Sequence, residues 1–191
     1  DGGDGWDVVY YIDAGSAVTV DRVTATNNFG EAVGDTFANV ERFVLSNFND
    51  RYVGTTGSDF VSGAAGNDTL LGGDGTDTLY GDEGADTITG GNGADWIDGG
   101  TGNDSLTGGA GNDVFAFAAG FGKDTITDFV AGAGVADVRE IDDAGFAKLS
   151  AVLAAASQAG ADTVITYDAN NTITLKNVTK TALQADDFQF V

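Results

Sequence analysis

A motif of nine residues repeats seven times in succession from Gly54 to Ala116, and it limits the chain to a repetitive fold. The units read GTTGSDFVS, GAAGNDTLL, GGDGTDTLY, GDEGADTIT, GGNGADWID, GGTGNDSLT and GGAGNDVFA. Every unit has Gly at its first and fourth places, Asp at its sixth place and an apolar residue at its eighth. The sixth-place residues are Asp59, Asp68, Asp77, Asp86, Asp95, Asp104 and Asp113, and the eighth-place residues are Val61, Leu70, Leu79, Ile88, Ile97, Leu106 and Phe115.

Two further copies of the motif precede this run. Leu45–Val53 keeps Asp50 at the sixth place but has lost its glycines, whereas Gly2–Tyr10 is a complete copy with Asp7 at the sixth place. Asp7 has no obvious partner at Tyr11–Thr19, so the pattern does not predict a bound ion there.

Each unit predicts a turn followed by a very short strand. Glycine permits the positive φ angles and close backbone approaches that tight turns need. The last three residues of each unit are rich in β-branched, aromatic and aliphatic types, and only the middle side chain of such a strand points inward. Two units then make one coil, and coils stacked about 4.8 Å apart form two facing parallel sheets.

This stacking predicts two columns of carboxylates along the edges of the fold. Asp59, Asp77, Asp95 and Asp113 fall on one edge, and Asp50, Asp68, Asp86 and Asp104 fall on the other. Unit charges one strand spacing apart repel by about 0.9 kcal/mol in water and by about 3.5 kcal/mol at an effective dielectric of 20. The columns therefore need a neutralising partner.

Calcium fits this requirement because it takes six to eight oxygen ligands from carboxylates and backbone carbonyls. Magnesium demands stricter octahedral geometry, and zinc or copper would favour the His and Cys residues that the chain lacks. The alternative is that Asp-Gly turns merely terminate strands. That alternative does not explain Asp at the same place in all seven units.

Composition argues against catalysis within this chain. The sequence has no His, Cys, Met or Pro, which removes disulfides, thiolate metal sites and any Ser-His-Asp triad. No G-x-S-x-G motif is present. We therefore predict that this chain is not itself an enzyme, although a longer parent protein could be one.

The charge balance excludes two classes of partner. Thirty acidic residues, 26 of them Asp, oppose eight basic ones and give a net charge of −22. Such a chain is repelled by nucleic acid and by anionic membranes, and no stretch is apolar enough to insert into a bilayer. Because the chain starts inside a repeat and shows no signal peptide, we expect an upstream domain of the same chain to precede it.

The repeat resembles the calcium-binding nonapeptide of the RTX family over residues 45–116. The resemblance implies a mainly β, right-handed parallel β-roll (a β-solenoid) with a C-terminal α/β capping segment that contains one helix. It also implies Ca²⁺ as the bound ion, in a protein of the secreted type.

In that family each ion lies between successive turns on one edge. One turn supplies its second and fourth carbonyls and its Asp, and the next turn supplies its first and third carbonyls and its Asp. Carried onto this sequence, the resemblance implies five ligand sets: Thr55, Gly57 and Asp59 with Gly72, Asp74 and Asp77; Ala64, Gly66 and Asp68 with Gly81, Glu83 and Asp86; Gly73, Gly75 and Asp77 with Gly90, Asn92 and Asp95; Asp82, Gly84 and Asp86 with Gly99, Thr101 and Asp104; and Gly91, Gly93 and Asp95 with Gly108, Ala110 and Asp113.

Additional sites would bring the total to between five and eight ions. A sixth set would combine Asp50 with Gly63, Ala65 and Asp68. Sites beyond the last regular turns would join Gly100, Gly102 and Asp104, or Gly109, Gly111 and Asp113, to partners such as Asp124 or Asp128.

Three regions are predicted. Residues 1–53 would form irregular coils of the roll with an inserted loop, or alternatively a separate small subdomain, with strands at Ala17–Val20 and Asn39–Leu45. Residues 54–116 would form the regular roll. Residues 117–191 would cap it, beginning with FGKDTITDF at Phe121–Phe129, which resembles the segment that follows the roll in the family.

Within the predicted cap we expect one helix from about Phe146 to Gln158, started by Asp143, with Leu149, Val152, Leu153 and Ala156 on one face. A hairpin would join Thr163–Tyr167 to Thr172–Leu175. The ending Asp187–Val191 is a final strand, and it resembles the uncleaved C-terminal signal of type I secretion substrates.

These features predict a calcium-binding module that folds in extracellular calcium, supports type I secretion and stabilises an upstream domain. The expected location is the exterior or surface of a Gram-negative bacterium. The parent would be a secreted enzyme such as a serralysin-like protease, a lipase or an alginate epimerase, or alternatively an adhesin or surface-layer protein. Binding of a polysaccharide by the roll itself is a third alternative.

Overall fold

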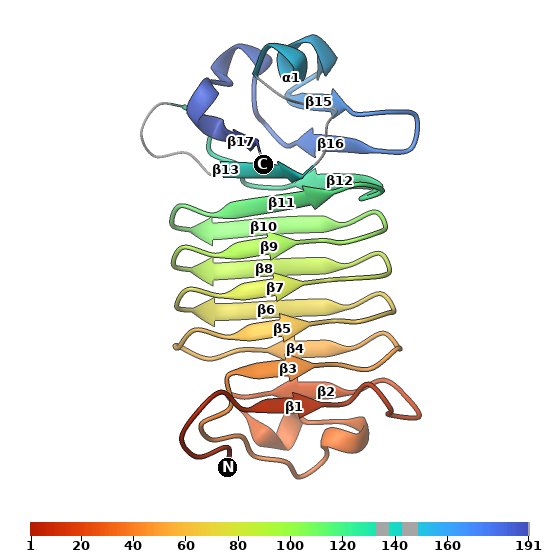
Figure 1. The fold of residues 1–191 in the computed structure, drawn as a ribbon, viewed down its shortest axis with the longest axis vertical. Coiled ribbons are helices and arrows are strands. Elements are labelled where there is room, and N and C mark those ends of the chain that lie inside the picture. The colour runs from red at the N-terminus through yellow and green to blue at the C-terminus, as the bar shows by residue number, and fades with distance from the viewer. Residues whose placement is uncertain (133–137, 143–148, 191) are drawn as a thin grey trace.

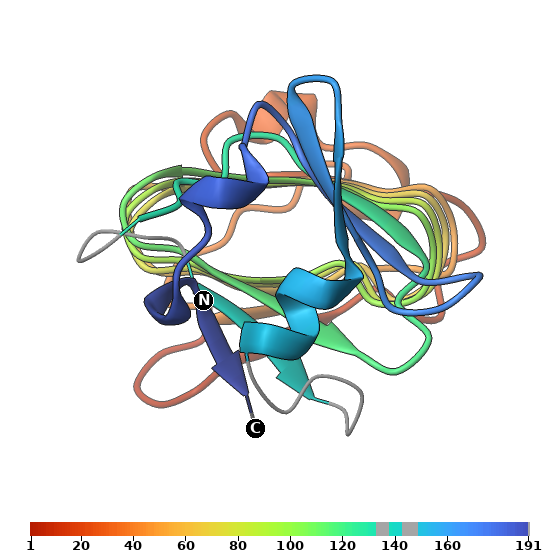
Figure 2. The same ribbon diagram turned by 90° about the horizontal axis from the view of Figure 1, so that it is seen from above.

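The chain winds into a parallel β-roll whose short strands alternate between two facing sheets (Figure 1). The structure, a computed structural model, describes residues 1–132, 138–142 and 149–190. In this part of the chain, sheet A has the order β1-β3-β5-β7-β9-β11-β13-β17 and sheet B has the order β14-β15-β16-β12-β10-β8-β6-β4-β2. Seen along the long axis, the coils of the roll superimpose as a flattened ring (Figure 2). The predicted mainly β, parallel roll is confirmed.

The regular repeats supply seven strands, one for each nonapeptide. Three strands of sheet B are six residues long, because pairing there continues through the two glycines that open the next unit, as in Gly73↔Gly91. The strands are β5 (Phe60–Ser62), β6 (Thr69–Asp74), β7 (Thr78–Tyr80), β8 (Thr87–Asn92), β9 (Trp96–Asp98), β10 (Ser105–Ala110) and β11 (Val114–Ala118).

The core is a single file of eighth-place side chains between the two sheets. Register pairs each of these residues with its equivalent two units away, as in Val61↔Leu79 and Leu70↔Ile88. All seven are fully buried, and the file continues outside the regular repeats through Val20, Phe43, Tyr52 and Ile126. The predicted inward position of the eighth place is confirmed.

The N-terminal residues extend both sheets. The strands are β1 (Val8–Tyr10) and β3 (Arg42–Val44) in sheet A, and β2 (Thr19–Asp21) and β4 (Arg51–Val53) in sheet B. Between β2 and β3 lie the short 3-10 helices η1 (Ala25–Asn27) and η2 (Gly30–Ala32), at the N-terminal end of the roll (Figure 1). The strands of the first 53 residues thus belong to the same two sheets as the regular repeats.

The C-terminal residues change the direction of pairing. The remaining elements are β12 (Lys123–Ile126), β13 (Val138–Asp142), α1 (Leu149–Ala155), β14 (Ala156–Ala159), β15 (Asp162–Thr166), β16 (Thr172–Leu175), η3 (Lys180–Ala182), η4 (Ala185–Asp187) and β17 (Phe188–Phe190). Strand β16 continues sheet B in parallel with β12, but β15 pairs antiparallel with β16, which confirms the predicted hairpin. Parallel pairing in sheet B ends at this hairpin, whereas sheet A stays parallel through β13 and β17.

The predicted helix is wrong at its C-terminal end. Helix α1 ends at Ala155, and Ala156–Ala159 form β14, which pairs antiparallel with β15. Strand pairing in the tertiary fold overrides the helical preference of this alanine-rich segment. Val152 and Ala156 of the expected apolar face are buried. The predicted start at Phe146 and its cap Asp143 lie outside the described residues, as does Val191 of the expected C-terminal signal.

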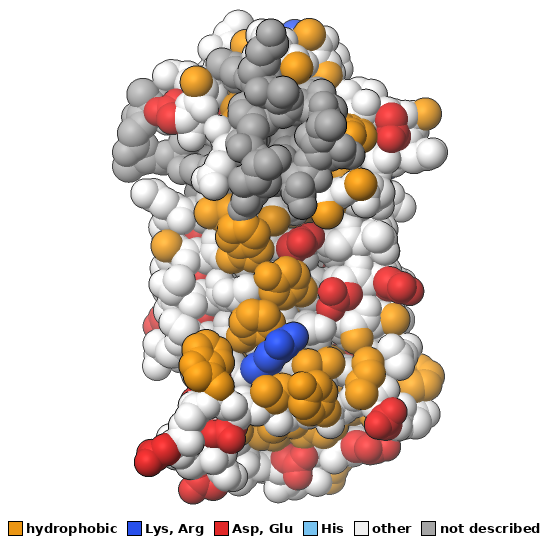
Figure 3. Space-filling view, in the orientation of Figure 1, with side chains coloured by type: hydrophobic (Ala, Val, Ile, Leu, Met, Phe, Trp, Pro, Cys, Tyr) orange, Lys and Arg blue, Asp and Glu red, His pale blue; other side chains and the backbone are white. Residues whose placement is uncertain are grey.

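The two sheets differ on their outward faces. Strands β5, β7 and β9 of sheet A carry aromatic residues, and the rings of Phe60 and Tyr80 lie 5.5 Å apart. The guanidinium of Arg42 lies 4.5 Å above the ring of Phe60. Hydrophobic side chains with a basic group among them are visible along one face of the molecule (Figure 3).

We predict that Ile88→Ala lowers the free energy of unfolding by about 2–5 kcal/mol, because the narrow core cannot close over the lost atoms. Thr87→Ala, at the exposed neighbouring position, should change it by less than about 0.5 kcal/mol. Urea unfolding in saturating calcium measures both. Equal, small losses in the two variants would show that the file of eighth-place residues does not stabilise the fold.

Candidate metal centres

The sixth-place aspartates form two continuous columns, one at each edge of the roll. In both columns the backbone N–H of one Asp donates to Oδ1 of the next Asp on the same edge, over 2.7–3.0 Å. Asp124 adds one more carboxylate to the column that contains Asp104. The predicted same-edge pairing is present in the structure, and we call the column of Asp59, Asp77, Asp95 and Asp113 column A and the column of Asp50, Asp68, Asp86, Asp104 and Asp124 column B.

These carboxylates are buried, and most keep one oxygen without a protein partner. None of the nine is more than 4% exposed. A buried carboxylate oxygen that lacks a hydrogen-bond donor is costly unless another charge compensates it. Within the described residues, buried Oδ2 atoms without a hydrogen-bond donor belong to the column residues Asp68, Asp77, Asp86, Asp95, Asp104 and Asp124.

The first-place glycines leave space beside these oxygens. A Cβ atom on Gly72 would overlap Oδ2 of Asp77 and would lie 2.6 Å from the carbonyl oxygen of Gly90. A Cβ on Gly63 would likewise overlap Oδ2 of Asp68 and approach the carbonyl of Gly81 at 2.7 Å. Each space is thus bordered by a carboxylate from one coil and a first-place carbonyl from the next, and both belong to the same predicted ligand set.

The other predicted carbonyls lie between the same turns but have hydrogen bonds of their own. The N–H of Asp74 donates to the second-place carbonyl of Thr55 over 2.9 Å. The N–H of Gly75 donates to the third-place carbonyl of Asn92 over 2.8 Å. Fourth-place glycines are stacked so closely that a side chain on Gly93, where φ is +138°, would overlap the carbonyl of Gly75. Ligation by the second-, third- and fourth-place carbonyls therefore stays a prediction.

Oxygen is the only ligand atom that these turns offer. Among the described residues, no group of three or more His, Cys, Asp or Glu side chains is gathered closely enough to hold a metal. An ion in a column must therefore take part of its ligands from backbone carbonyls, beside one or two carboxylates. That donor set fits Ca²⁺, which accepts such mixtures, better than Zn²⁺ or Mg²⁺.

Burial raises the pKa values of eight column carboxylates, and neighbouring negative charges add to the rise at five of them. The pKa rises to about 8 at Asp68, where Asp86 and Asp50 contribute, and to about 7 at Asp77. It rises to about 6 at Asp86 and Asp104 and to about 8 at Asp124. These pKa values lie near neutral pH. Ionising these carboxylates in the folded state therefore costs free energy unless a cation lies beside them.

Acidic residues on either side of the regular repeats also contact neighbouring coils. Asp7 has a same-edge partner outside Tyr11–Thr19, because Oε2 of Glu41 accepts the N–H of Asp7 over 2.9 Å. Residues 36–44 are a degenerate unit with Glu41 at the sixth place and Phe43 at the eighth, and only that apolar eighth place could have revealed it. Asp128 accepts the N–H groups of Gly108 and Gly109 over 3.0 and 2.8 Å.

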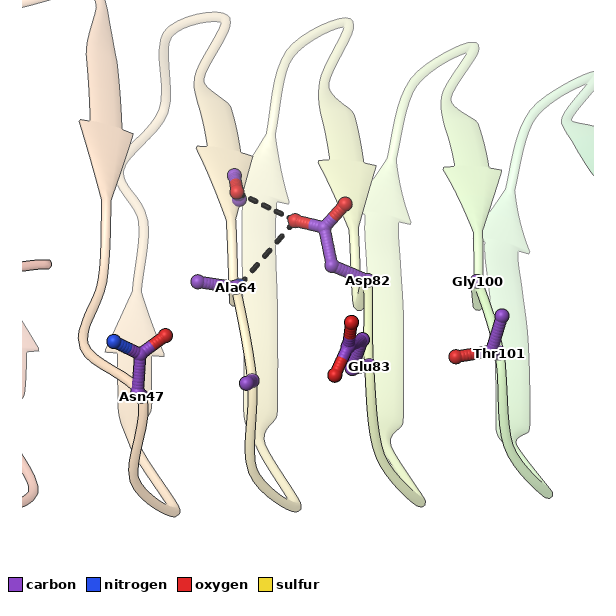
Figure 4. A pocket seen from close by; sticks show the side chains of 8 residues that line it. Asn47, Ala64, Asp82, Glu83, Gly100 and Thr101 are labelled. Carbon is purple, nitrogen blue, oxygen red and sulfur yellow. Dashed lines mark hydrogen bonds between the residues drawn. The ribbon is translucent and has the colours of Figure 1, made fainter.

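A hollow of about 520 Å³ lies on the outside of the edge that carries column B (Figure 4). Asp82 projects across it, and its Oδ2 accepts from Ser62 Oγ at 2.5 Å and from the Ala64 N–H at 3.3 Å. Ala64 and Asp82 stand at second places with φ of 73° and 69°, where the equivalent residue elsewhere is often Gly. The predicted ligand sets use only the backbone carbonyls of these two residues.

The described part of the chain holds no helix of the length and apolarity that crossing a membrane requires.

Comparison with known proteins agrees with the site geometry. The family model described as the RTX calcium-binding nonapeptide repeat (4 copies) matches residues 46–79, 80–115 and 89–126. No curated protein matches the sequence.

Several solved structures resemble the fold. Extracellular lipase LipA from Serratia marcescens aligns with a TM-score of 0.44 and 16% identity, over 88% of this chain and 43% of the lipase. The chain thus spans less than half the length of that lipase. The AlgE6R2 subunit of the Azotobacter vinelandii mannuronan C5-epimerase aligns with a TM-score of 0.39 and 28% identity, over 80% of this chain and 94% of the subunit. The AlgE6R3 subunit gives 0.38 and 28%, over 75% and 78%.

We predict that Gly72→Ala weakens calcium binding at one site by about 10- to 100-fold, because the added methyl fills the space between Asp77 and Gly90. Gly15→Ala is the matched control, since a Cβ there meets no atom within 4 Å. Isothermal titration of both proteins with CaCl₂ measures the change. Unaltered binding by the Gly72 variant would mean that no ion uses this space.

We predict that calcium-free protein becomes more stable as the pH falls from 8 to 5. The folded pKa values of about 6 to 8 lie above the ordinary value near 4, so protonation favours the fold. This contribution is complete below about pH 4 and is lost as the pH rises through 6 to 8. Circular dichroism of metal-stripped protein should show more β-structure at pH 5 than at pH 8, and the gain in β-structure on adding calcium should be smaller at pH 5. A calcium effect that grows at pH 5 would contradict it.

Proposed function

We propose, starting from the fact that residues 46–126 belong to the RTX calcium-binding nonapeptide repeats, that calcium controls the folding of this chain. The observation that carries the proposal is the set of buried Asp Oδ2 atoms that lack a protein donor, each in a column of like charges. A chain without neutralising ions would have to fold against this repulsion. Folding would therefore follow the calcium concentration around the protein.

The carboxylates and the first-place carbonyls of the next coil would hold the ions. Asp77 with Gly90, and Asp68 with Gly81, are examples of such pairs from the two columns. Bound calcium would supply the positive charge that makes close stacking of the carboxylates favourable. The chain contributes glycines that bring successive turns together and a file of apolar side chains that aligns the coils.

The energies suit a switch between the inside and the outside of a cell. If each site has a Kd near 10⁻⁴ M, about 1 mM calcium stabilises the fold by about 1.4 kcal/mol per site, or about 7 kcal/mol over five sites. Submicromolar calcium adds almost nothing. A gain of that size is comparable to the whole stability of a typical domain.

Such a switch suits export by a type I secretion route. The unfolded, strongly acidic chain would pass through a secretion channel with its C-terminal segment acting as the signal. Outside the cell, calcium would fold the roll from its C-terminal cap and stabilise the domain upstream. In the fold, the Asp187 carboxylate accepts the N–H groups of Gly132 and Gln184, which supports a second role for this segment within the cap.

The role of the parent protein is a further part of the proposal. A secreted protease, lipase or epimerase would carry a catalytic motif upstream of Asp1, such as H-E-x-x-H or G-x-S-x-G. An adhesin or surface-layer protein would carry tandem β-sandwich repeats instead. The sequence of the full-length gene separates these alternatives.

We predict that circular dichroism of the metal-stripped chain at pH 8 shows little β-structure, and that it gains a β spectrum cooperatively between micromolar and millimolar calcium. Asp86→Asn should raise the midpoint calcium concentration by about tenfold or more, since Asp86 lies in two predicted ligand sets. Asp13→Asn removes the same charge from an exposed position and serves as the control. A chain that is already β-rich in excess EGTA at pH 8 would refute calcium-controlled folding.

A further inference from the structure

The side chain of Arg22 enters the interior of the roll from the N-terminal coils. Its backbone follows β2, and its guanidinium lies 5.0 Å above the ring of Phe43 and 3.5 Å from the hydroxyl of Tyr52. There it forms an ion pair with Oδ1 of Asp59, the first carboxylate of column A. The Asp59 side chain is fully buried and that of Arg22 is 12% exposed, so the pair is shielded from water.

Arg22 takes a position that a backbone amide takes elsewhere in the column. Oδ1 of Asp77 accepts the N–H of Asp59, and Oδ1 of Asp95 accepts the N–H of Asp77. In this pattern, Oδ1 of each Asp accepts the N–H of the sixth-place residue one coil earlier, which for Asp59 is Glu41. The N–H of Glu41 instead donates to the carbonyl of Asp7 over 3.2 Å. The insert before β3 thus leaves Oδ1 of Asp59 to Arg22.

The other column ends differently at the same level. Asp50 accepts the Ser46 N–H at 2.6 Å, the Ser46 hydroxyl at 2.8 Å and the Val18 N–H at 2.7 Å, all of them neutral donors. Oδ2 of Asp59 accepts the Thr55 N–H over 3.0 Å. Both oxygens of Asp50 and Asp59 therefore have protein donors, unlike those of the column carboxylates Asp68, Asp77, Asp86, Asp95, Asp104 and Asp124.

We infer that the Arg22 guanidinium closes column A at its N-terminal end in the place of a calcium ion. The inference rests on the calcium-controlled folding proposed above. It means that the N-terminal coils attach to the roll through a cation that is part of the chain, and that no calcium binds between the turns of Glu41 and Asp59. The calcium-dependent stretch of column A then begins at the space between Asp59 and Asp77.

The test compares Arg22→Met, Asp59→Asn and the double variant in the full chain, with Arg51→Gln as a control that removes the same charge from an exposed position. Removing one partner of a buried ion pair leaves the other charge buried and uncompensated, which destabilises the fold. At a fixed, intermediate calcium concentration we expect Arg22→Met to raise the unfolding equilibrium constant by about 100-fold or more. Adding Asp59→Asn should reverse most of that change, and Arg51→Gln should resemble the wild type.

Hydrogen exchange locates the effect. In Arg22→Met the amides of β3 and β4 should lose protection first, whereas the turns at Asp95 and Asp113 keep theirs. Should Arg22→Met not fold, Arg22→Lys, which keeps the charge, and the double variant, which removes both charges, should still fold.

An Arg22→Met variant that matches Arg51→Gln, or a double variant no more stable than Arg22→Met, would overturn the inference. In either case the wild type would still fold with calcium. Failure of the proposed function is distinct, because the wild type itself would then show no calcium-dependent folding.

Discussion

Repulsion between stacked carboxylates is the constraint on which this fold depends. Each coil places one buried Asp at each edge, and the next coil places another on top of it at the spacing of paired strands. In a protein environment each neighbouring pair of charges costs several kcal/mol, and the cost recurs along both columns. The apolar interior is one side chain wide, so it cannot offset this cost alone. Neutralisation by cations decides whether the coils stack.

The glycines make neutralisation possible because they have no side chain. At the first place, the missing side chain leaves the space between a carboxylate and the carbonyl of the next coil. At the fourth place, positive φ and the absence of Cβ let successive turns stack in direct backbone contact, as at Gly75 and Gly93. Because the glycines recur at the same places in each unit, successive coils of the regular roll have the same space beside a carboxylate. The carboxylates at the ends of the columns have no such neighbouring coil on one side and need another group to compensate their charge. Arg22 and Ser46 are the groups that the chain supplies at its N-terminal end.

The regular roll could be predicted from sequence because the nonapeptide assigns each place one physical task. Turn, carboxylate and inward apolar residue recur at constant spacing, so the core file and both columns follow from counting. Glu41 stays in phase with the count, but its unit has lost the glycines and the Asp that identify the motif. Arg22 could not be predicted in this way, because it lies in the insert before residue 36, where the count is broken, and its partner depends on tertiary register. The strand at Ala156–Ala159 was also unpredictable, since its alanine-rich sequence favours a helix until β15 lies beside it. Local periodicity therefore predicts the repeats, while the two ends depend on long-range pairing.

The most direct measurement is a crystal structure of this chain grown in millimolar calcium, with anomalous data collected to locate the ions. We expect anomalous peaks in both columns, each within 2.3–2.6 Å of an Asp oxygen and of carbonyl oxygens from adjacent coils. The peaks should lie beside Oδ2 of Asp68, Asp77, Asp86, Asp95 and Asp104, where a buried oxygen lacks a protein donor. An intact roll with no calcium density beside these aspartates would contradict the claim that bound ions hold the stacked turns together.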